Sequence, residues 1–321
     1  MNCLGRAVCR TSLNRFFPLS AAVVLLLGAC GLATDTVADG GHEPDLLAAV
    51  ESEYLVGDWN GDGLDNLAVR YGNCVYMDFN FDGVHDRLQC YGNGTSEDQY
   101  LVGDWNGDRL DNLAVRRGNC VYMDFNFDGV HDRLQCYGNG TSEDQYLVGD
   151  WNGDGLDNLA VRRGNCVYMD FNFDGVQDRL QCYGNGTSED QYLVGDWNGD
   201  GLDNLAVRRG NCVYMDFNFD GVQDRLQCYG NGASEAQYLV GDWNGDRLDN
   251  LAVRRGNCVY MDFNFDGVQD RLQCYGNGAS EAQYLVDDWN GDRLDNLAVR
   301  RNDCVYRDFN FDGVHDRLQS K

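Results

Sequence analysis

Side chains that carry oxygen recur at every second residue in the stretch DWNGDGLDNLAV, residues 58–69. Asp58, Asn60 and Asp62 stand so close in the chain that the two carboxylates would repel each other without a counter-ion. A hard cation such as Ca²⁺ takes roughly six to eight oxygen ligands, including carboxylates and backbone carbonyls. Gly63, at the sixth position, allows the tight bend toward the carbonyl at the seventh. The spacing therefore predicts a calcium-binding loop.

A second loop of the same pattern begins at Asp78 and continues with Asn80, Asp82 and Gly83. Neither loop is an EF-hand, because the twelfth position is Val69 in the first loop and Gln89 in the second, where an EF-hand has Glu. The alternative interpretation is that both loops are Asx-turns, in which Asp and Asn side chains bond to backbone groups and no ion is bound.

Both loops belong to a repeat that fills the chain from Tyr54 to its end. The segment YLVGDWNGD recurs every 46 residues (100 − 54 = 46), the last time as YLVDDWNGD, and begins at Tyr54, Tyr100, Tyr146, Tyr192, Tyr238 and Tyr284. The six units cover residues 54–99, 100–145, 146–191, 192–237, 238–283 and 284–321. A period of this length indicates a solenoid, a propeller or an array.

Four short strands are predicted in each unit. For the second unit they are QYLVGDW, NLAVRRG, CVYMDFN and DRLQCYG, which begin at residues 99, 112, 120 and 132, the first of them one residue before the unit. Each is rich in Val, Leu, Tyr or Phe and is bounded by Gly, Asn or Asp. The prediction is an all-β fold, a β-propeller of six four-stranded blades. Both acidic loops join successive antiparallel strands and should emerge on one rim, but the sequence does not show how the ring closes.

The segment VGDWNGDGLDNLAV, residues 56–69, resembles the FG-GAP repeat, also called the VCBS-type repeat, of integrin α-chains and many bacterial surface proteins. The resemblance covers residues 54 to about 320. It implies a β-propeller with calcium in loops at the blade ends. The implied ligands are the side chains at positions one, three, five and nine and the backbone carbonyl at position seven.

These positions identify one set of candidate calcium ligands in each loop. In the first loops the side chains are Asp58, Asn60, Asp62, Asn66; Asp104, Asn106, Asp108, Asn112; Asp150, Asn152, Asp154, Asn158; Asp196, Asn198, Asp200, Asn204; Asp242, Asn244, Asp246, Asn250; and Asp288, Asn290, Asp292, Asn296. In the second loops they are Asp78, Asn80, Asp82, Asp86; Asp124, Asn126, Asp128, Asp132; Asp170, Asn172, Asp174, Asp178; Asp216, Asn218, Asp220, Asp224; Asp262, Asn264, Asp266, Asp270; and Asp308, Asn310, Asp312, Asp316.

The first loops depart further from the family pattern than the second. The ninth position is Asn66 where the family has Asp, and Asp65 stands one place early. The sixth position is Arg109, Arg247 or Arg293 in three copies, which would cost about 1 kcal/mol if a positive φ is needed there. The second loops keep Gly throughout, although Phe81 and its equivalents replace the Gly usual at position four. We therefore expect the second loops to be the better calcium sites.

The repeats also place cysteines in pairs. Cys74 and Cys90 lie symmetrically about Asp82, so a hairpin would bring them opposite each other. The expected disulfides are Cys74–Cys90, Cys120–Cys136, Cys166–Cys182, Cys212–Cys228 and Cys258–Cys274; Cys304 has no such partner because Ser320 takes that place. The alternatives are links from one unit to the next, from Cys90 to Cys120 onward, and buried free thiols.

The N-terminus predicts export. Arg6, Arg10 and Arg15 precede the apolar run FFPLSAAVVLLLGA, residues 16–29, which is too short to span a bilayer comfortably. Leu27–Cys30 (LGAC) resembles a bacterial lipobox, which implies that residues 1–29 are removed and that Cys30 is lipidated. The alternative is an ordinary cleavage site with an incidental Cys. Residues 30–53 are expected to be a tether, which gives a lipoprotein of the outer membrane or cell surface.

Composition and repetition limit the function. The chain of 321 residues has 52 acidic and 25 basic residues, a net charge of −27, which argues against nucleic acid as a partner. Catalysis needs an asymmetric set of groups, whereas here the same loop position is His in three copies and Gln in the others, as His85, His131, His315, Gln177, Gln223 and Gln269. We expect a surface binding module for a protein or glycan, with a calcium-stiffened structural spacer as the alternative and an enzyme last.

Overall fold

The computed structural model describes residues 52–95, 97–141, 144–187, 190–230, 237–276, 283–302 and 304–320. The expected signal peptide, most of the expected tether and Cys30 lie outside these residues. Within them, no helix is long and apolar enough to cross a membrane.

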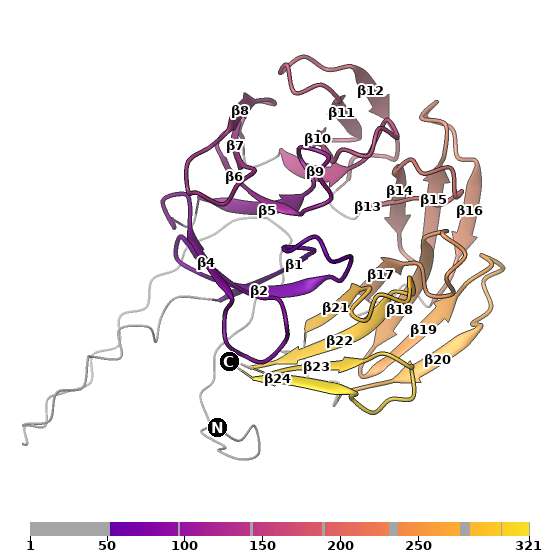
Figure 1. Ribbon diagram of the computed structural model, residues 1–321. Helices are drawn as coiled ribbons and strands as arrows, with labels where there is room; N and C mark the ends of the chain where they lie inside the picture. Colours follow the sequence, from indigo (N-terminus) through magenta and orange to yellow (C-terminus); the bar gives the residue numbers. More distant parts are fainter. Residues whose placement is uncertain are drawn as a thin grey trace, which may run out of the picture. The chain divides into compact units, whose positions relative to one another are not determined.

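Six antiparallel sheets of four strands each form a ring, so the expected six-bladed β-propeller is confirmed (Figure 1). In the first blade β1 is Glu53–Gly57, β2 is Asn66–Tyr71, β3 is Cys74–Asp78 and β4 is Arg87–Cys90, hydrogen-bonded in that order. The other blades are β5 Gln99–Gly103, β6 Asn112–Arg117, β7 Cys120–Asp124, β8 Arg133–Cys136; β9 Gln145–Gly149, β10 Asn158–Arg163, β11 Cys166–Asp170, β12 Arg179–Cys182; β13 Gln191–Gly195, β14 Asn204–Arg209, β15 Cys212–Asp216, β16 Arg225–Cys228; β17 Gln237–Gly241, β18 Asn250–Arg255, β19 Cys258–Asp262, β20 Arg271–Cys274; and β21 Gln283–Asp287, β22 Asn296–Arg301, β23 Cys304–Asp308, β24 Arg317–Ser320.

Each blade is made from one uninterrupted repeat, and no strand passes from one sheet to another. The first strands of successive blades, β1, β5, β9, β13, β17 and β21, are neighbours in space. They therefore form the inner part of the ring, and the fourth strands form its outer edge. Both acidic loops of a blade, β1–β2 and β3–β4, emerge at the same ends of the strands, as predicted from the antiparallel order.

The hydrophobic core lies between neighbouring blades. In the first junction Trp59, Val75 and Met77 of blade one pack with Leu113 and Val115 of blade two. All six Trp side chains are buried, so they are packing residues and none of them is an exposed contact residue. The Trp59 indole Nε1–H donates to the carbonyl of Asn66 at 3.3 Å, so the ring is also fixed in orientation.

The ring closes by side-chain packing and hydrogen bonds between the sixth and first blades. Tyr54 and Leu67 pack with Trp289, and Gln319 Nε2 donates to Asp78 Oδ2 at 2.5 Å. Arg307, where the other copies have Met, is fully buried here and donates to Gln319 Oε1 at 2.6 Å. Burial lowers the pKa of Arg307 to about 9. The closing junction thus contains a buried cation where the other junctions have a Met side chain.

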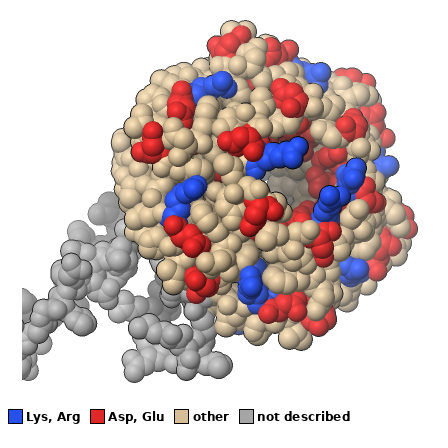
Figure 2. All heavy atoms as spheres, viewed as in Figure 1, with Lys and Arg blue, Asp and Glu red and all other residues tan. Residues whose placement is uncertain are grey.

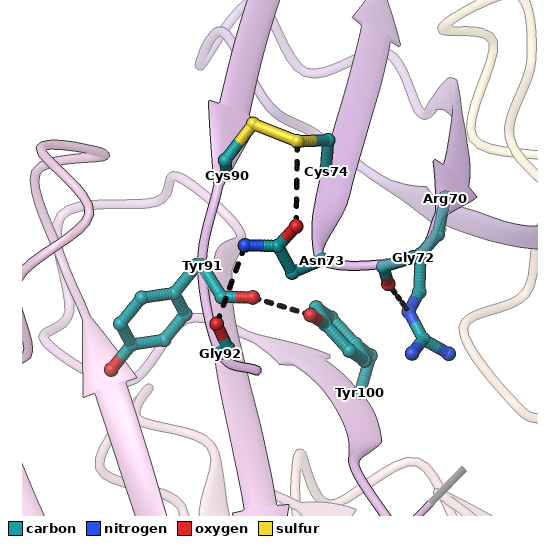
Figure 3. Close-up of a disulfide and its surroundings, with 8 residues drawn as sticks. All are labelled: Arg70, Gly72, Asn73, Cys74, Cys90, Tyr91, Gly92 and Tyr100. Atoms are coloured by element: carbon teal, nitrogen blue, oxygen red, sulfur yellow. Dashed lines mark hydrogen bonds between the residues drawn. A yellow bond between two sulfur atoms is a disulfide. The ribbon is translucent and has the colours of Figure 1, made fainter. Parts of the chain in front are cut away.

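All five expected hairpin disulfides are present. Cys74 and Cys90 are paired in register across β3 and β4, with Cα atoms 3.9 Å apart, and the other four pairs repeat this geometry. Figure 3 shows the first disulfide beside Asn73, whose side-chain amide donates to the Gly92 carbonyl at 3.4 Å. The segment that follows β4 and leads to the next blade is therefore held next to the disulfide. Cys304 is in register with Ser320.

Candidate functional site

The first loop is closed by its own carboxylates. Asp58 Oδ1 accepts the Gly61 N–H at 2.7 Å and the Asp62 N–H at 3.2 Å, and Oδ2 accepts the Gly63 N–H at 2.8 Å. Asn60 Nδ2 donates to Asp62 Oδ2 at 3.0 Å. These are Asx-type hydrogen bonds, and they bring the side chains at positions one, three and five to one side of the loop.

The ninth residue of the first loop lies elsewhere. Asn66 is fully buried, and its Nδ2 donates to the carbonyl of Phe79 in the second loop at 3.3 Å. The other five copies make the same bond. Asn66 Oδ1 is buried without a hydrogen-bond partner among the described residues. Asn66 therefore joins the two loops of a blade, and no hydrogen bond connects its side chain with Asp58, Asn60 or Asp62.

The residue before it, Asp65 and its equivalents, joins adjacent blades. Asp111 Oδ2 accepts the backbone N–H of Asp58 at 2.8 Å, and the Asp111 N–H donates to the Asp58 carbonyl at 2.9 Å. The same pair of bonds joins Asp157 to Asp104, Asp203 to Asp150, Asp249 to Asp196 and Asp295 to Asp242. Each first loop is thus clamped to the first loop of the next blade.

The clamp accounts for the glycine at position 57 and raises the pKa of the clamping carboxyls. A Cβ on Gly57 would lie 2.8 Å from Asp111 Oδ2, so the close approach requires Gly there. Burial, opposed by the bond from the Asp58 N–H, raises the pKa of Asp111 to about 7. The pKa is raised in the same way to about 7 in Asp203, Asp249 and Asp295 and to about 6 in Asp157.

The closing junction has a different clamp. Asp287 replaces the Gly, and its Oδ1 accepts the N–H of Asp288 at 3.2 Å. Asp65 keeps only the backbone bond to the Asp288 carbonyl, at 3.3 Å. The side chains of Asp65 and Asp287 contact each other, and burial raises the pKa of both carboxyls.

The second loop brings two of its four predicted ligands, Asn80 and Asp86, into contact. Asp86 Oδ2 accepts the Phe79 N–H at 2.8 Å and Oδ1 accepts from Asn80 Nδ2 at 3.3 Å. Asn80 Oδ1 accepts the Asp82 N–H at 2.9 Å, and Asp82 Oδ1 accepts the Val84 N–H at 2.8 Å. The side chains of Asn80 and Asp86 are therefore in contact, while the Asp82 carboxylate caps the following turn.

The first ligand position of the second loop is buried in the blade junction. Asp124 is fully buried, and its Oδ2 accepts from Gln89 Nε2 of the preceding blade and from the Gly129 N–H at 2.7 Å. Burial raises its pKa, which the hydrogen bonds from Gly129 and Asn126 oppose. This carboxylate holds its loop to the neighbouring blade.

Phe81 and its equivalents occupy position four with positive φ, at 59–60°. A bulky residue rarely adopts this conformation. Here the strain is accompanied by packing across the junction, because Phe127 packs on the core of blade one and lies 4.4 Å below the Arg87 guanidinium. Phe at this position, where the family pattern has Gly, therefore contributes to the packing between blades.

The arginines at position six of the first loops have the conformation that was anticipated. Arg109, Arg247 and Arg293 have φ of 68°, 70° and 69°, close to the 80° of Gly63. The Arg109 N–H still donates to Asp104 Oδ2 at 2.8 Å. The loop shape is kept, with left-handed strain in three of the six copies.

The donor chemistry of these loops is that of a hard-cation site, but the acidic groups are spread out. In the described part of the chain, no group of three or more His, Cys, Asp or Glu side chains is placed to hold a metal ion. In the second loop of the first blade one carboxylate and one amide, of Asp86 and Asn80, are in direct contact. Each loop has one predicted ligand engaged elsewhere: Asn66 of the first loop bonds to Phe79, and Asp124 of the second loop accepts from Gln89 and Gly129.

A separate feature is a pocket of about 160 Å³ between blades one and two. Its wall includes Tyr91, Asn93, Arg117, Tyr122 and His131. The Tyr91 side chain is 6% exposed, and its hydroxyl is buried with no hydrogen-bond partner among the described residues. In Figure 3 the Tyr91 ring points away from Tyr100, whose own hydroxyl donates to the Tyr91 carbonyl.

Arg117 is held in this pocket by a buried acid. Its Nε donates to Asp98 Oδ1 at 2.8 Å, and Asp98 Oδ2 accepts the N–H groups of Asn93 and Gly94, both at 2.8 Å. Burial alone would raise the pKa of Asp98, but the bonds from Arg117 and the backbone hold it below its usual value. His131 makes an edge contact with Tyr122, with ring centres 5.6 Å apart.

Sequence reasoning missed this pocket because its residues come from two repeats. The repetition carries a usable signal, since Tyr91 recurs as Tyr137, Tyr183, Tyr229 and Tyr275, and each of these hydroxyls is again buried without a partner among the described residues. A second pocket, of about 80 Å³, lies at the closing junction and includes His85. Figure 2 shows acidic and basic side chains interspersed on one face of the ring, around a central hollow.

We expect Arg109→Gly to stabilise the propeller by about 1 kcal/mol, because Gly adopts positive φ without steric strain. The reverse change, Gly155→Arg, should destabilise by a similar amount: φ there is 81°, and a Cβ would meet nothing within 4 Å. Urea unfolding of both variants measures this pair of effects. A loss of stability in Arg109→Gly would show that its side chain makes a compensating interaction.

Without calcium, the thermal midpoint should fall as the pH rises from about 4 to 7. Asp111 and its four equivalents have folded-state pKa values of about 6 or 7, above the unfolded value of about 4. The folded state therefore holds these protons more tightly, and the stability they contribute is lost as pH rises through the folded value. Melts in EDTA across this range measure the slope.

The matched variant for this pH dependence replaces all five carboxyls with Asn, which keeps an acceptor oxygen for the clamp and removes the titration. Its midpoint should change less with pH than that of the wild type. Equal slopes in the two proteins would assign the pH dependence to other groups.

No family model and no curated protein matches the chain. Among solved structures it is similar to an Agrocybe aegerita lectin that specifically recognises non-reducing terminal N-acetylglucosamine, with a TM-score of 0.59, 14% identity, and coverage of 85% of this chain and 80% of that chain. It is also similar to the Photorhabdus luminescens Tc holotoxin pore, with a TM-score of 0.54, 16% identity, and coverage of 79% of this chain but only 14% of that chain. At these identities the similarities show the propeller fold alone.

Proposed function

We propose that this chain is a surface binding module, a calcium-stabilised propeller attached to a membrane through lipid on Cys30, whose inter-blade pockets bind a glycan. The observation that carries the proposal is the pocket between blades one and two. It combines aromatic rings with a buried Tyr91 hydroxyl that has no partner among the described residues. A buried polar group without a partner is costly, and a ligand hydroxyl in the pocket would supply the missing hydrogen bond.

The size and lining of the pocket favour a saccharide. Its volume of about 160 Å³ is below the roughly 300–1,000 Å³ of pockets for drug-sized ligands. Tyr122 offers an apolar ring face, while Asn93 and Arg117 offer directional donors and acceptors. A sugar ring presents both kinds of surface. The similarity in fold to a lectin supports this ligand class over a protein partner.

Repetition would make such binding multivalent. The Tyr and Arg of the pocket recur in the next four junctions, as Tyr137 with Arg163, Tyr183 with Arg209, Tyr229 with Arg255, and Tyr275 with Arg301. Weak single sites on one rigid ring can give a much higher overall affinity for a surface with many copies of a glycan. The proposal includes no catalytic group. Catalysis needs an asymmetric set of groups, whereas each candidate residue here is repeated around the ring.

A glycan array, followed by calorimetry on the strongest ligand, tests the binding proposal. We expect replacement of Tyr91, Tyr137, Tyr183, Tyr229 and Tyr275 by Phe to weaken binding at least tenfold. The same variant should keep or slightly raise the thermal midpoint, because it removes hydroxyls that are buried without partners. Leu88→Ala, on the exposed face of β4, is the control and should bind like the wild type. Absence of any glycan ligand would favour the structural spacer.

Calcium is proposed for the second loops, where Asn80 is already bonded to the side chain of Asp86 and to the backbone of Asp82. The resemblance to FG-GAP repeats supports the same assignment. At a free concentration tenfold above the dissociation constant, each site would contribute about 1.4 kcal/mol, or about 8 kcal/mol for six sites. This is the scale of a whole domain's stability, so calcium would be a structural requirement.

Thermal melts with excess Ca²⁺ and with EDTA test the metal sites directly. We expect a midpoint higher in calcium by tens of degrees, and a smaller difference when Asp86 and its five equivalents are replaced by Asn. Asn66→Asp in the first loop is the comparison variant, and it should not increase the calcium effect if that residue joins the two loops as observed. An unchanged wild-type midpoint would mean that the loops are Asx-turns without a bound ion.

A further inference from the structure

A tyrosine that follows the fourth strand fills each of the five junctions between successive blades. Tyr91 packs in one core cluster with Tyr100, Leu113 and Val115 of the next blade and with Val75 of its own blade. Four equivalents pack in the same way in the other junctions: Tyr137, Tyr183, Tyr229 and Tyr275. All five side chains are more than nine-tenths buried. Each of these junctions therefore contains a place for one phenol ring.

The closing junction has no tyrosine in this place among its described residues. The corresponding position of the sixth repeat is Lys321. The core cluster of the junction contains Tyr54, Leu67 and Val69 but, in the part that the structure describes, no counterpart of Tyr91. A pocket of about 80 Å³ lies here. We call it the closing pocket, and its lining includes Tyr54, Leu67, Val69, Asp78, Val305 and Gln319.

The apolar lining of the closing pocket corresponds to the surface that the tyrosine covers elsewhere. Tyr54, Leu67, Val69 and Val305 are the counterparts of four residues that pack with Tyr91 in the first junction. Val69 is 9% exposed, whereas its five counterparts are 0–1% exposed: Val115, Val161, Val207, Val253 and Val299. Apolar surface that is covered in five junctions is thus accessible in the sixth.

The polar end of the closing pocket also differs from its counterparts. Asp78 is 5% exposed, and its Oδ1 is buried without a hydrogen-bond partner among the described residues. In the second repeat Asp124 Oδ1 accepts the Asn126 N–H at 3.2 Å, and the next four copies make the same bond. Asp78 Oδ2 already accepts from Gln319 and from the N–H of Gly83. The pocket therefore has one acceptor oxygen left for the hydroxyl of a ligand.

A phenol ring fits both parts of the closing pocket. An engineered apolar cavity of roughly 150 Å³ encloses a whole benzene molecule, so a pocket of about 80 Å³ holds a ring only in part, with its attached chain outside. The ring would cover Leu67 and Val69, and a hydroxyl at its inner end would donate to Asp78 Oδ1. A saccharide has hydroxyls around its whole ring, and most of them would lose their hydrogen bonds to water against this apolar wall.

We propose that the closing pocket binds the tyrosine side chain of another polypeptide. The bound ring takes the place that Tyr91 has in the first junction and completes the apolar core of the last one. The five internal rings show the chemistry of this partner, since each is a tyrosine side chain carried by a polypeptide. The site does not depend on the proposed glycan binding, because its junction is not among the proposed glycan pockets.

Calorimetric titration of the whole protein with the peptide acetyl-Gly-Tyr-Gly-amide tests the proposal. We expect one peptide to bind per chain. The matched peptide with phenylalanine should bind at least tenfold more weakly, because its ring has no hydroxyl to donate to Asp78 Oδ1. The compound p-cresol, which is the tyrosine side chain without a backbone, should compete for the same site.

Two variants at one position connect the binding with the closing pocket. Lys321→Tyr should place a ring of the chain itself in the pocket, which raises the thermal midpoint and lowers the affinity for the tyrosine peptide at least tenfold. Lys321→Ala is the matched control, and it should bind the peptide at least as tightly as the wild type.

Equal binding of the tyrosine peptide by the wild type and by Lys321→Tyr would overturn the inference, as would binding of neither the peptide nor p-cresol. Binding of p-cresol without the peptide would also overturn it, because the ligand would then be a free phenol. None of these outcomes bears on the proposed glycan binding, which the glycan array tests separately.

Discussion

The whole structure depends on contacts between one blade and the next. A four-stranded sheet of this size cannot bury its own apolar side chains, and each blade here covers them only by packing on its neighbour. The core clusters each contain residues of two blades, with one buried Trp in each. The polar residues follow the same constraint, because the Asp111 clamp and the Gln89 to Asp124 bond both cross this boundary. Removing one junction would expose both adjoining sheets.

The loops that resemble metal sites also serve as joints. Asp58 and Asp104 carry the backbone groups that the next blade's clamp engages, while Asn66 connects the two loops within a blade. Any ion bound in these loops would act next to the contacts that hold the ring together. This placement gives a physical reason for coupling between metal binding and stability, since order in the loop and order in the junction share hydrogen bonds.

Much of the fold could be predicted because its signals are local. Strand lengths, turns and hairpin partners lie within one 46-residue unit, so the strands, the blade count and the disulfide between Cys74 and Cys90 follow from the unit itself. The roles of Asp65, Phe81 and Tyr91 could not be predicted. Their partners lie in another repeat; Asp58 and Asp111, for example, are 53 residues apart in the chain. The way one blade packs on the next cannot be predicted from the sequence of a single unit. The same limit applies to Asn66. The spacing of the motif predicts its side chain as a metal ligand, whereas in the structure its carbonyl accepts the hydrogen bond from the Trp59 indole and its side chain donates to the Phe79 carbonyl.

The confinement of each blade to a single repeat has an evolutionary consequence. Unequal recombination between nearly identical gene segments adds or removes whole units of 46 codons. Such an event in this chain would insert or delete a complete sheet with its disulfide and its two loops, and every remaining sheet would keep its own hydrogen bonds. Propellers that complete a blade with strands from both chain ends do not have this freedom. Every junction would then have to accommodate a new angle between blades, and the closing junction already differs from the others, with Asp287 and Arg307 in place of Gly and Met. The number of blades can thus change in a single genetic step without disrupting any sheet, and only the contacts between sheets have to adjust.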